Sequence, residues 1–201
     1  MPERQPALAA ALRPPLAAVP GAGLRLAEVP FTAKLILRGD AGDAAFRAGA
    51  EEALGCPLPA AGGSCAGSAG AVLWLGPGEW LATGPPDAEE RMAEALGRAL
   101  SGHRAAIVDV TDGRVQLRLS GPRVREVLAK GCPLDLHPSA FGPGRVAASL
   151  LAQADILLHC LGTEGEAPAD PVFDLYVARS FAPYVRAWLV DAGHEFRVGA
   201  G

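Results

Sequence analysis

The sequence predicts an α+β fold made of duplicated split-βαβ, or ferredoxin-like, halves with a mostly antiparallel sheet. Residues 24–112 read as short strands and helices in the order β-α-β-β-α-β, and residues 113–198 show a similar pattern. Glycine and proline turns separate these elements, as they do in hairpins and at helix ends. We therefore expect residues 24–201 to form a single α+β domain, although no letter-by-letter repeat connects its halves.

Residues 1–23 are expected to form a flexible arm rich in alanine and proline. The segment has repeated helix breakers and no periodic apolar stripe, so it cannot build a core alone. An alternative is that Leu8, Leu12 and Leu16 lie across a partner subunit, because apolar residues in such a segment need another surface to cover them.

The first half begins with extended segments on either side of Pro30, within residues 24–38. Residues 43–54 follow as a short helix, which Gly55 ends. Its apolar side consists of Phe46, Ala50, Ala53 and Leu54. Residues 71–83 then contain the turn signal Gly-Pro-Gly-Glu between two apolar runs, which predicts a β-hairpin.

Two tryptophans, Trp74 and Trp80, are placed near the tip of this hairpin. After it, Asp87 and Glu90 have the spacing of a capping box, which predicts the start of a helix. Gly102 is expected to end that helix, whose apolar side is Met92, Leu96, Ala99 and Leu100.

The densest local information lies in residues 107–138. Apolar residues alternate there with polar ones, as in a half-buried strand; the apolar ones are Val115, Leu117 and Leu119. Ser120, Gly121 and Pro122 end this strand and open a helix, since serine and glycine suit the cap and proline suits the first turn. Gly131 is expected to close the helix in the left-handed conformation.

The second half continues with residues 145–152 and 155–161 as paired strands and residues 172–178 as another strand. A helix over residues 180–192 completes it, and Ser180 is its predicted cap. The predicted buried side of this helix follows the spacing i, i+3, i+4, i+7, i+8 and consists of Phe181, Tyr184, Val185, Trp188 and Leu189.

Charge and composition exclude two classes of partner. A formal net charge of −4 and a pI near 5.6 argue against a nucleic-acid-binding surface. No run of about 18 apolar residues occurs, so no membrane partner is expected. The four cysteines have no close paired spacing and no export signal precedes them, which predicts free thiols in the cytoplasm. They are Cys56, Cys65, Cys132 and Cys160.

No cofactor-binding, metal or nucleophile site is predicted within this chain. The glycines do not form G-x-G-x-x-G between a strand and a helix, and the histidines and cysteines are scattered. Candidate residues for a partner interface are Trp80, Arg114 and Arg118. The two arginines share a polar strand face, and a tryptophan can anchor an interface. The alternative is an ordinary solvated face and a core aromatic residue.

A resemblance to a known family is carried by four stretches: LGPGEWL at residues 75–81, VDV at 108–110 with RLSGP at 118–122, LAKGCPLDLHP at 128–138, and DLYVARSF at 174–181 followed by Trp188 and Leu189. In this order they resemble the gamma subunit of heterotetrameric sarcosine oxidase, over about residues 24–196. The resemblance implies a fold similar to the folate-binding domain of glycine-cleavage aminomethyltransferases.

The same resemblance implies an accessory, structural subunit with no catalysis of its own. The complex would oxidatively demethylate sarcosine to glycine, forming hydrogen peroxide and methylene-tetrahydrofolate. This chain would bind the alpha, beta and delta subunits, chiefly alpha. FAD, FMN, NAD, zinc and tetrahydrofolate would belong to those other subunits, which agrees with the lack of nucleotide and metal motifs here.

Asp135 is the one catalytic candidate. By resemblance it occupies the place where related aminomethyltransferases carry an Asn-Asp pair whose aspartate works on the folate-bound one-carbon unit, but Leu134 stands here in place of the asparagine. The alternative is a turn or cap residue, or a salt-bridge partner of Arg123 or Arg145. A competing hypothesis for the whole chain is a stand-alone folate-binding protein or one-carbon transferase of the same fold.

Overall fold

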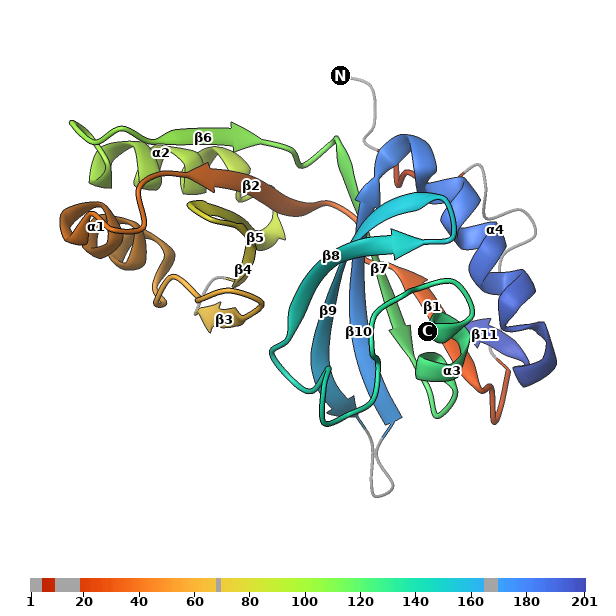
Figure 1. Cartoon of the computed structure of the whole chain (residues 1–201). Coiled ribbons are helices and arrows are strands. Elements are labelled where there is room, and N and C mark those ends of the chain that lie inside the picture. The colour runs from red at the N-terminus through yellow and green to blue at the C-terminus, as the bar shows by residue number, and fades with distance from the viewer. Residues whose placement is uncertain (1–4, 10–18, 68–69, 165–169) are drawn as a thin grey trace. The chain divides into compact units, whose positions relative to one another are not determined.

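The computed structural model describes residues 5–9, 19–67, 70–164 and 170–201. The chain forms two compact units, each with its own sheet and helices (Figure 1). Residues 31–114 make the first, which we call the inserted unit, and residues 1–30 with 115–201 make the second, the flanking unit. No helix in the described ranges is long and apolar enough to cross a membrane.

The inserted unit is a five-stranded sheet in the order β3-β4-β5-β2-β6, in which neighbouring strands are antiparallel. Helices α1 and α2 pack against each other, and α2 contacts β2, β5 and β6. The elements are β2 (Thr32–Arg38), α1 (Ala44–Leu54), β3 (Ser64–Gly67), β4 (Gly70–Gly76), β5 (Glu79–Pro86), α2 (Glu89–Ala99) and β6 (Ala106–Asp109).

The flanking unit is a six-stranded sheet in the order β11-β1-β7-β10-β9-β8. Helix α3 contacts β1, β10 and helix α4. The elements are β1 (Leu24–Glu28), β7 (Arg114–Ser120), α3 (Val124–Ala129), β8 (Val146–Leu151), β9 (Ala154–Glu164), β10 (Asp170–Ala178), the 3₁₀ turn η1 (Arg179–Phe181), α4 (Ala182–Ala192), η2 (His194–Phe196) and β11 (Val198–Ala200).

The two sheets repeat one topology. If β1 is set aside, the order β8-β9-β10-β7-β11 of the flanking unit matches β3-β4-β5-β2-β6 of the inserted unit, element for element along the chain. Strand β1 is the added element, since it lies between β7 and β11 and pairs antiparallel with the first and parallel with the second. The α+β prediction of duplicated split-βαβ halves with mostly antiparallel strands is therefore confirmed.

The placement of β1 differs from the division expected from the sequence. The segment Leu24–Glu28 falls within the first half expected from the sequence, residues 24–112, as one of the extended segments on either side of Pro30. In the structure Leu26 pairs with Leu119 of β7, so the segment belongs to the sheet of the second half. Strand partners this far apart in sequence leave no local signal.

Each unit buries one apolar cluster. In the flanking unit the alternating residues of β7 point into a core that α3 and α4 cover; its members include Leu24, Val115, Leu117, Leu119, Val127, Phe173, Leu175, Val185 and Leu189. In the inserted unit the apolar sides of α1 and α2 pack against the sheet. The cluster includes Leu35, Leu37, Phe46, Ala50, Trp80, Leu96 and Leu100. The period-2 and period-3.6 patterns of the sequence thus locate most of both cores.

Part of the N-terminal segment is anchored to the flanking unit. Leu8 is only 1% exposed and belongs to the apolar cluster of that unit. The backbone N–H groups of Ala7 and Leu8 donate to the Glu28 carboxylate at 2.9 and 3.1 Å. Residues 5–9 therefore differ from the expected flexible arm, and Leu12 and Leu16 lie outside the described residues.

Two predicted helix starts are corrected. Helix α4 begins at Ala182 after the turn η1, with Phe181 at the cap position and no side-chain capping bond, so Ser180 is not its cap. Helix α2 begins at Glu89 with Ala88 at the cap position. Asp87 has φ of 60°, whereas a capping residue needs the extended conformation, so the predicted capping box does not form.

The end of helix α3 is also corrected. Lys130 occupies the cap position in the right-handed helical conformation, and Gly131 is not among the residues with positive φ. Glycine is required there for another reason, because a Cβ atom at Gly131 would lie 2.5 Å from the indole of Trp188. The small residue lets α4 approach the chain that follows α3.

Two helical glycines of the inserted unit give a matched stability test. A Cβ atom at Gly49 in α1 would lie 2.8 Å from the carbonyl oxygen of Ala99 in α2, whereas one at Gly97 would meet nothing within 4 Å. We expect Gly97→Ala to raise the free energy of unfolding by about 0.5–1 kcal/mol, since alanine favours helix. Gly49→Ala should lower it by about 1 kcal/mol or more, because the clash exceeds that gain. Urea unfolding of both variants checks this, and equal stabilisation would contradict the helix packing.

Candidate functional site

Polar side chains from four adjacent strands gather on the face of the six-stranded sheet opposite its helices. The apolar residues of β1, β7, β9 and β10 enter the core, so the residues between them point to the other face. We call this set the polar face; it consists of Arg25, Gln116, Arg118, Ser120, His159, Glu164, Asp170 and Asp174. Strand alternation brings most of these groups together, and a register shift between β9 and β10 at Val172 and Phe173 adds Glu164, which is five residues from His159, to the same face.

Asp174 of β10 is the buried centre of the polar face. Its carboxylate accepts two parallel hydrogen bonds from Arg118 of β7, with Nε to Oδ1 and Nη2 to Oδ2 both at 2.9 Å. The side-chain amide of Gln116 donates to Oδ2 at 2.8 Å. Only 3% of the Asp174 side chain is exposed, against 44% for Arg118. This fork geometry is the strongest form of ion pair and fixes β10 to β7.

His159 lies opposite Asp174 in the register of β9 and β10 and is 5% exposed. Burial lowers the pKa of its imidazole from the ordinary value, Asp174 opposes this shift, and Arg118 adds to it. The neutral ring is therefore favoured in the folded chain.

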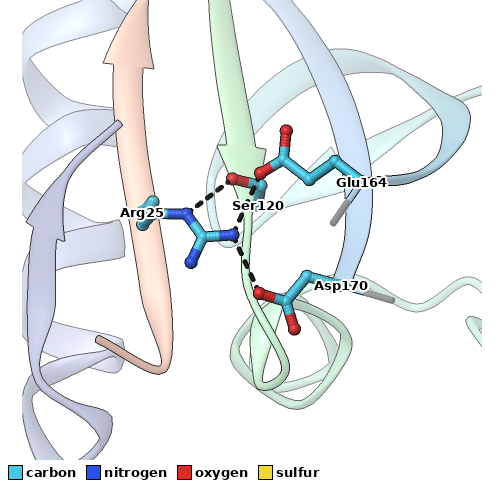
Figure 2. Close-up of polar contacts among 4 residues, drawn as sticks. All are labelled: Arg25, Ser120, Glu164 and Asp170. Carbon is cyan, nitrogen blue, oxygen red and sulfur yellow. Dashed lines mark hydrogen bonds and ion pairs between the residues drawn. The ribbon is translucent and has the colours of Figure 1, made fainter. Parts of the chain in front are cut away.

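A second cluster of the polar face joins β1 to the hairpin of β9 and β10 (Figure 2). Nη2 of Arg25 donates to Glu164 at 2.9 Å and to Asp170 at 2.8 Å, and its Nε donates to the Ser120 hydroxyl at 3.2 Å. The bonds from the Ser120 hydroxyl and Arg25 lower the pKa of Glu164. Asp170 and then Glu164 raise the pKa of Arg25. Because these groups are partly exposed, water weakens their pairing.

The polar face is suited to holding strands together. Its two arginines are bound to carboxylates of the same sheet, so they offer little unsatisfied charge to a ligand. Within the described residues, no group of three or more His, Cys, Asp or Glu side chains could hold a metal ion. The ion pairs of the polar face therefore serve to hold the strands of this sheet together.

Asp135, the catalytic candidate, lies at an exposed turn. Its Oδ1 accepts a hydrogen bond from the backbone N–H of His137 at 2.9 Å, which is the geometry of an Asx turn. Arg123 pairs with Glu126 at 2.6 Å. Asp135 therefore has the contact of a turn residue, which is the alternative to a catalytic role that the sequence suggests.

The three interface candidates lie in different settings. Trp80 is 3% exposed, its indole N–H donates to the carbonyl of Pro59 at 3.1 Å, and its ring lies 6.1 Å from that of Phe46. Trp80 is thus a core residue of the inserted unit and is not exposed to a partner. Arg114 is partly buried, which lowers the pKa of its guanidinium against the opposing effect of Glu79. Arg118 is the exposed partner of the Asp174 ion pair.

An exposed aromatic pair lies at the start of α4, where the sequence pattern predicts buried residues. Phe181 and Tyr184 were predicted to be buried, but they are 45% and 39% exposed, with an edge-to-face ring contact at 6.5 Å. Helix α4 buries Ala182, Val185 and Leu189 instead. Val185 and Leu189 are therefore buried as predicted, and Trp188 packs partly buried against the core, whereas Ala182 takes the place expected for the aromatic residues.

The chain is similar to known proteins of one family. The protein-family model described as "Sarcosine oxidase, gamma subunit family" matches residues 38–195. The chain is 40% identical over 176 residues to sarcosine oxidase subunit gamma of an Arthrobacter species, which covers 85% of this chain and 80% of the relative. It is 38% identical over 175 residues to the same subunit of Corynebacterium sp. (strain P-1), with coverage of 86% and 81%.

Two solved structures show the likeness of fold. Heterotetrameric sarcosine oxidase from Corynebacterium sp. U-96, in complex with pyrrole 2-carboxylate, contains a chain with a TM-score of 0.82 and 34% identity, over 96% of both chains. Aminomethyltransferase T of the glycine cleavage system from Bartonella henselae gives a TM-score of 0.56 at 17% identity, over 84% of this chain and 46% of that one. The second likeness concerns the fold alone.

The Arg118 and Asp174 pair predicts unequal losses of stability. Arg118→Met leaves a buried carboxylate without its cation and should lower the free energy of unfolding by about 3 kcal/mol. Asp174→Asn keeps the shape and frees an arginine that reaches water, so we expect a loss of about 1–2 kcal/mol. Denaturant unfolding of the two variants measures both, and a smaller loss for Arg118→Met would contradict the buried position of Asp174.

Neutral, buried His159 predicts a pH dependence of stability. Its pKa is lower folded than unfolded, so the unfolded chain binds the proton first as the pH falls. The free energy of unfolding should therefore decrease below about pH 6.5, by at most about 1.4 kcal/mol per pH unit from this group. His159→Gln should remove that part of the slope between pH 7 and 5. Identical slopes in the unchanged chain and in this variant would refute the assignment.

Proposed function

The chain belongs to the sarcosine oxidase gamma subunit family, and we propose that it is the accessory, structural subunit of a heterotetrameric sarcosine oxidase. The observation that carries this proposal is the agreement of fold over nearly the whole chain with a subunit-sized chain of the solved heterotetramer. Because the match covers 96% of both chains, it supports a similar position for this chain in a similar assembly.

The reaction proposed for the complex is the oxidative demethylation of sarcosine to glycine, with formation of hydrogen peroxide and methylene-tetrahydrofolate. The chemistry is assigned to the other subunits. In this chain the polar face is occupied by its own ion pairs, and Asp135 is an exposed turn residue. The buried carboxylate of Asp174 is bound by Arg118 and Gln116, and that of Asp135 accepts a backbone hydrogen bond at an exposed turn, so neither is placed as a free acid or base for catalysis.

The proposed partners are the alpha, beta and delta subunits, with alpha in the main contact, and the complex is assigned to the cytoplasm. FAD, FMN, NAD, zinc and tetrahydrofolate are proposed to lie in those subunits. The role of this chain is to bury surface against the assembly and so to hold it together.

The exposed pair Phe181 and Tyr184 is the part of the chain best suited to anchor that contact. Aromatic side chains bury large areas at low entropic cost and dominate the energy of many interfaces. The pair lies at the start of α4, where Val185 and Leu189 fix the helix in the core. Arg114 and Arg118 remain proposed as polar contacts at the edge of such an interface.

Co-purification of the tagged chain from its host tests the proposal. We expect a yellow complex that contains the larger flavoprotein subunits and produces hydrogen peroxide when sarcosine is added. A colourless chain without partners would overturn the accessory role. Measurable binding of tetrahydrofolate by that isolated chain would then favour the alternative of a stand-alone folate-binding protein.

A paired variant tests the contact residues separately. Phe181→Ser with Tyr184→Ser should reduce the yield of co-purified complex at least about tenfold, because loss of two anchors costs more than 1.4 kcal/mol. The matched control is Val108→Ser, which changes another exposed apolar residue, 46% exposed on β6. Equal yields for the double variant and the control would exclude the aromatic pair while leaving the accessory role intact.

A further inference from the structure

Two of the four cysteines lie side by side in the inserted unit. Cys56 follows Gly55, the left-handed residue that ends α1, and Cys65 lies on β3. Sγ of Cys56 is 3.9 Å from the carbonyl oxygen of Cys65, and the Cys65 thiol is near enough to raise the pKa of Cys56. The nine-residue separation in sequence gave no indication of this contact.

The position of Gly67 shows that both thiols occupy the same side of β3. A Cβ atom at Gly67 would lie 3.4 Å from Cβ and Sγ of Cys56. Residues i and i+2 of a strand point to the same face, so the side chain of Cys65 points toward the side on which Cys56 lies. The two thiol side chains therefore lie on the same side of β3, as an intramolecular disulfide between them requires.

The loop between the two cysteines is held in place at several points. The backbone N–H of Leu58 donates to the Glu51 carboxylate at 3.1 Å, and the Leu58 side chain is 7% exposed. The carbonyl of Pro59 accepts the indole N–H of Trp80 at 3.1 Å. These contacts join the loop to α1 and to the core, so the thiols are kept together by the fold and not by a chance loop conformation.

We propose that Cys56 and Cys65 are an oxidation site, at which a peroxide converts the two thiols to an intramolecular disulfide. Cys65 reacts first, because it is partly exposed while Cys56 is 7% exposed. Burial, and then the neighbouring Cys65 thiol, raise the pKa of Cys56 to about 12, which keeps Cys56 as the protonated thiol until its partner is oxidised.

The chemistry balances in two steps. The Cys65 thiolate attacks hydrogen peroxide, so an S–O bond forms, the O–O bond breaks, and hydroxide leaves and takes up the thiol proton as water. The Cys56 sulfur then attacks the sulfenic sulfur of Cys65, an S–S bond forms, and the S–O bond breaks with release of a second water. Two thiols are oxidised by two electrons, and one peroxide is reduced to two waters.

The other two cysteines are internal controls. Sγ of Cys132 contacts the Ser149 hydroxyl at 3.8 Å, and Sγ of Cys160 contacts the Arg125 guanidinium at 3.8 Å. Both are buried in the flanking unit, and neither of these contacts is to a sulfur atom. Peroxide should therefore leave them as thiols under conditions that oxidise the pair.

An oxidase that reduces oxygen to peroxide would supply the oxidant close to this site. Only this origin of the peroxide rests on the proposed function. The test uses added hydrogen peroxide, so its outcome does not depend on assembly or turnover. Failure of co-purification would remove the local source of peroxide, whereas failure of disulfide formation would refute only the oxidation site.

The experiment treats the reduced full-length chain with a small excess of hydrogen peroxide, unfolds it, alkylates free thiols and digests it with trypsin. No Lys or Arg lies between residues 48 and 90, so both cysteines fall in one peptide, residues 48–91, which contains no other cysteine. We expect that peptide to lose both alkyl groups in most molecules and to regain them after prior reduction with a dithiol.

Matched variants separate the two steps. Cys65→Ser should leave Cys56 fully alkylated after peroxide, and Cys56→Ser should let Cys65 proceed to sulfinic acid, because no resolving thiol remains. Cys132→Ser should leave the oxidation of residues 48–91 unchanged. Two alkylated thiols in that peptide after treatment, or a disulfide that joins either cysteine to Cys132, Cys160 or a second chain, would overturn the proposal.

Discussion

The strict alternation along β7 is the constraint on which the flanking unit depends. Val115, Leu117 and Leu119 enter the core beneath α3 and α4, so the residues between them must point to the opposite face. There Arg118 meets Asp174, whose carboxylate would be costly to bury alone. A one-residue slip of β7 would expose the apolar set and separate this pair, so core packing and the ion pair specify the same register.

Strand β1, which has no counterpart in the inserted unit, shows the same division between an apolar and a polar face as β7. Leu24 and Leu26 enter the same core as β7, while Arg25 points to the polar face and binds Glu164 and Asp170. The inserted unit has no strand at the corresponding place between β2 and β6, which pair directly. The added strand thus gives one copy of the fold a larger core and a second cross-strand tie, and it separates β11 from β7.

The sequence could predict the features that depend on local periodicity. The strands around Val115 and Phe173 and the helix around Phe46 were found because their apolar spacing is set by the core. Features fixed by distant partners were not found: the place of β1 depends on a strand some ninety residues away, as Arg25 opposite Ser120 shows. Alternation of Gln116 and Arg118 indicated the polar strand face, but the partner Asp174 could come only from the sheet order.

The pairing of charges on the polar face bears on the kind of surface this chain can offer. An arginine already held by a buried carboxylate adds little to binding, because a new partner must compete with a well-formed bidentate bond. Phe181 and Tyr184 have no such competition, since they are apolar rings in contact with each other and are 45% and 39% exposed. Burial of their exposed surface would gain hydrophobic free energy without breaking an ion pair, whereas the desolvation of Arg118 would offset much of the gain from its new contacts. A subunit that satisfies its own charges and leaves aromatic side chains exposed is therefore better suited to assembly through apolar contact than to recognition of a charged ligand.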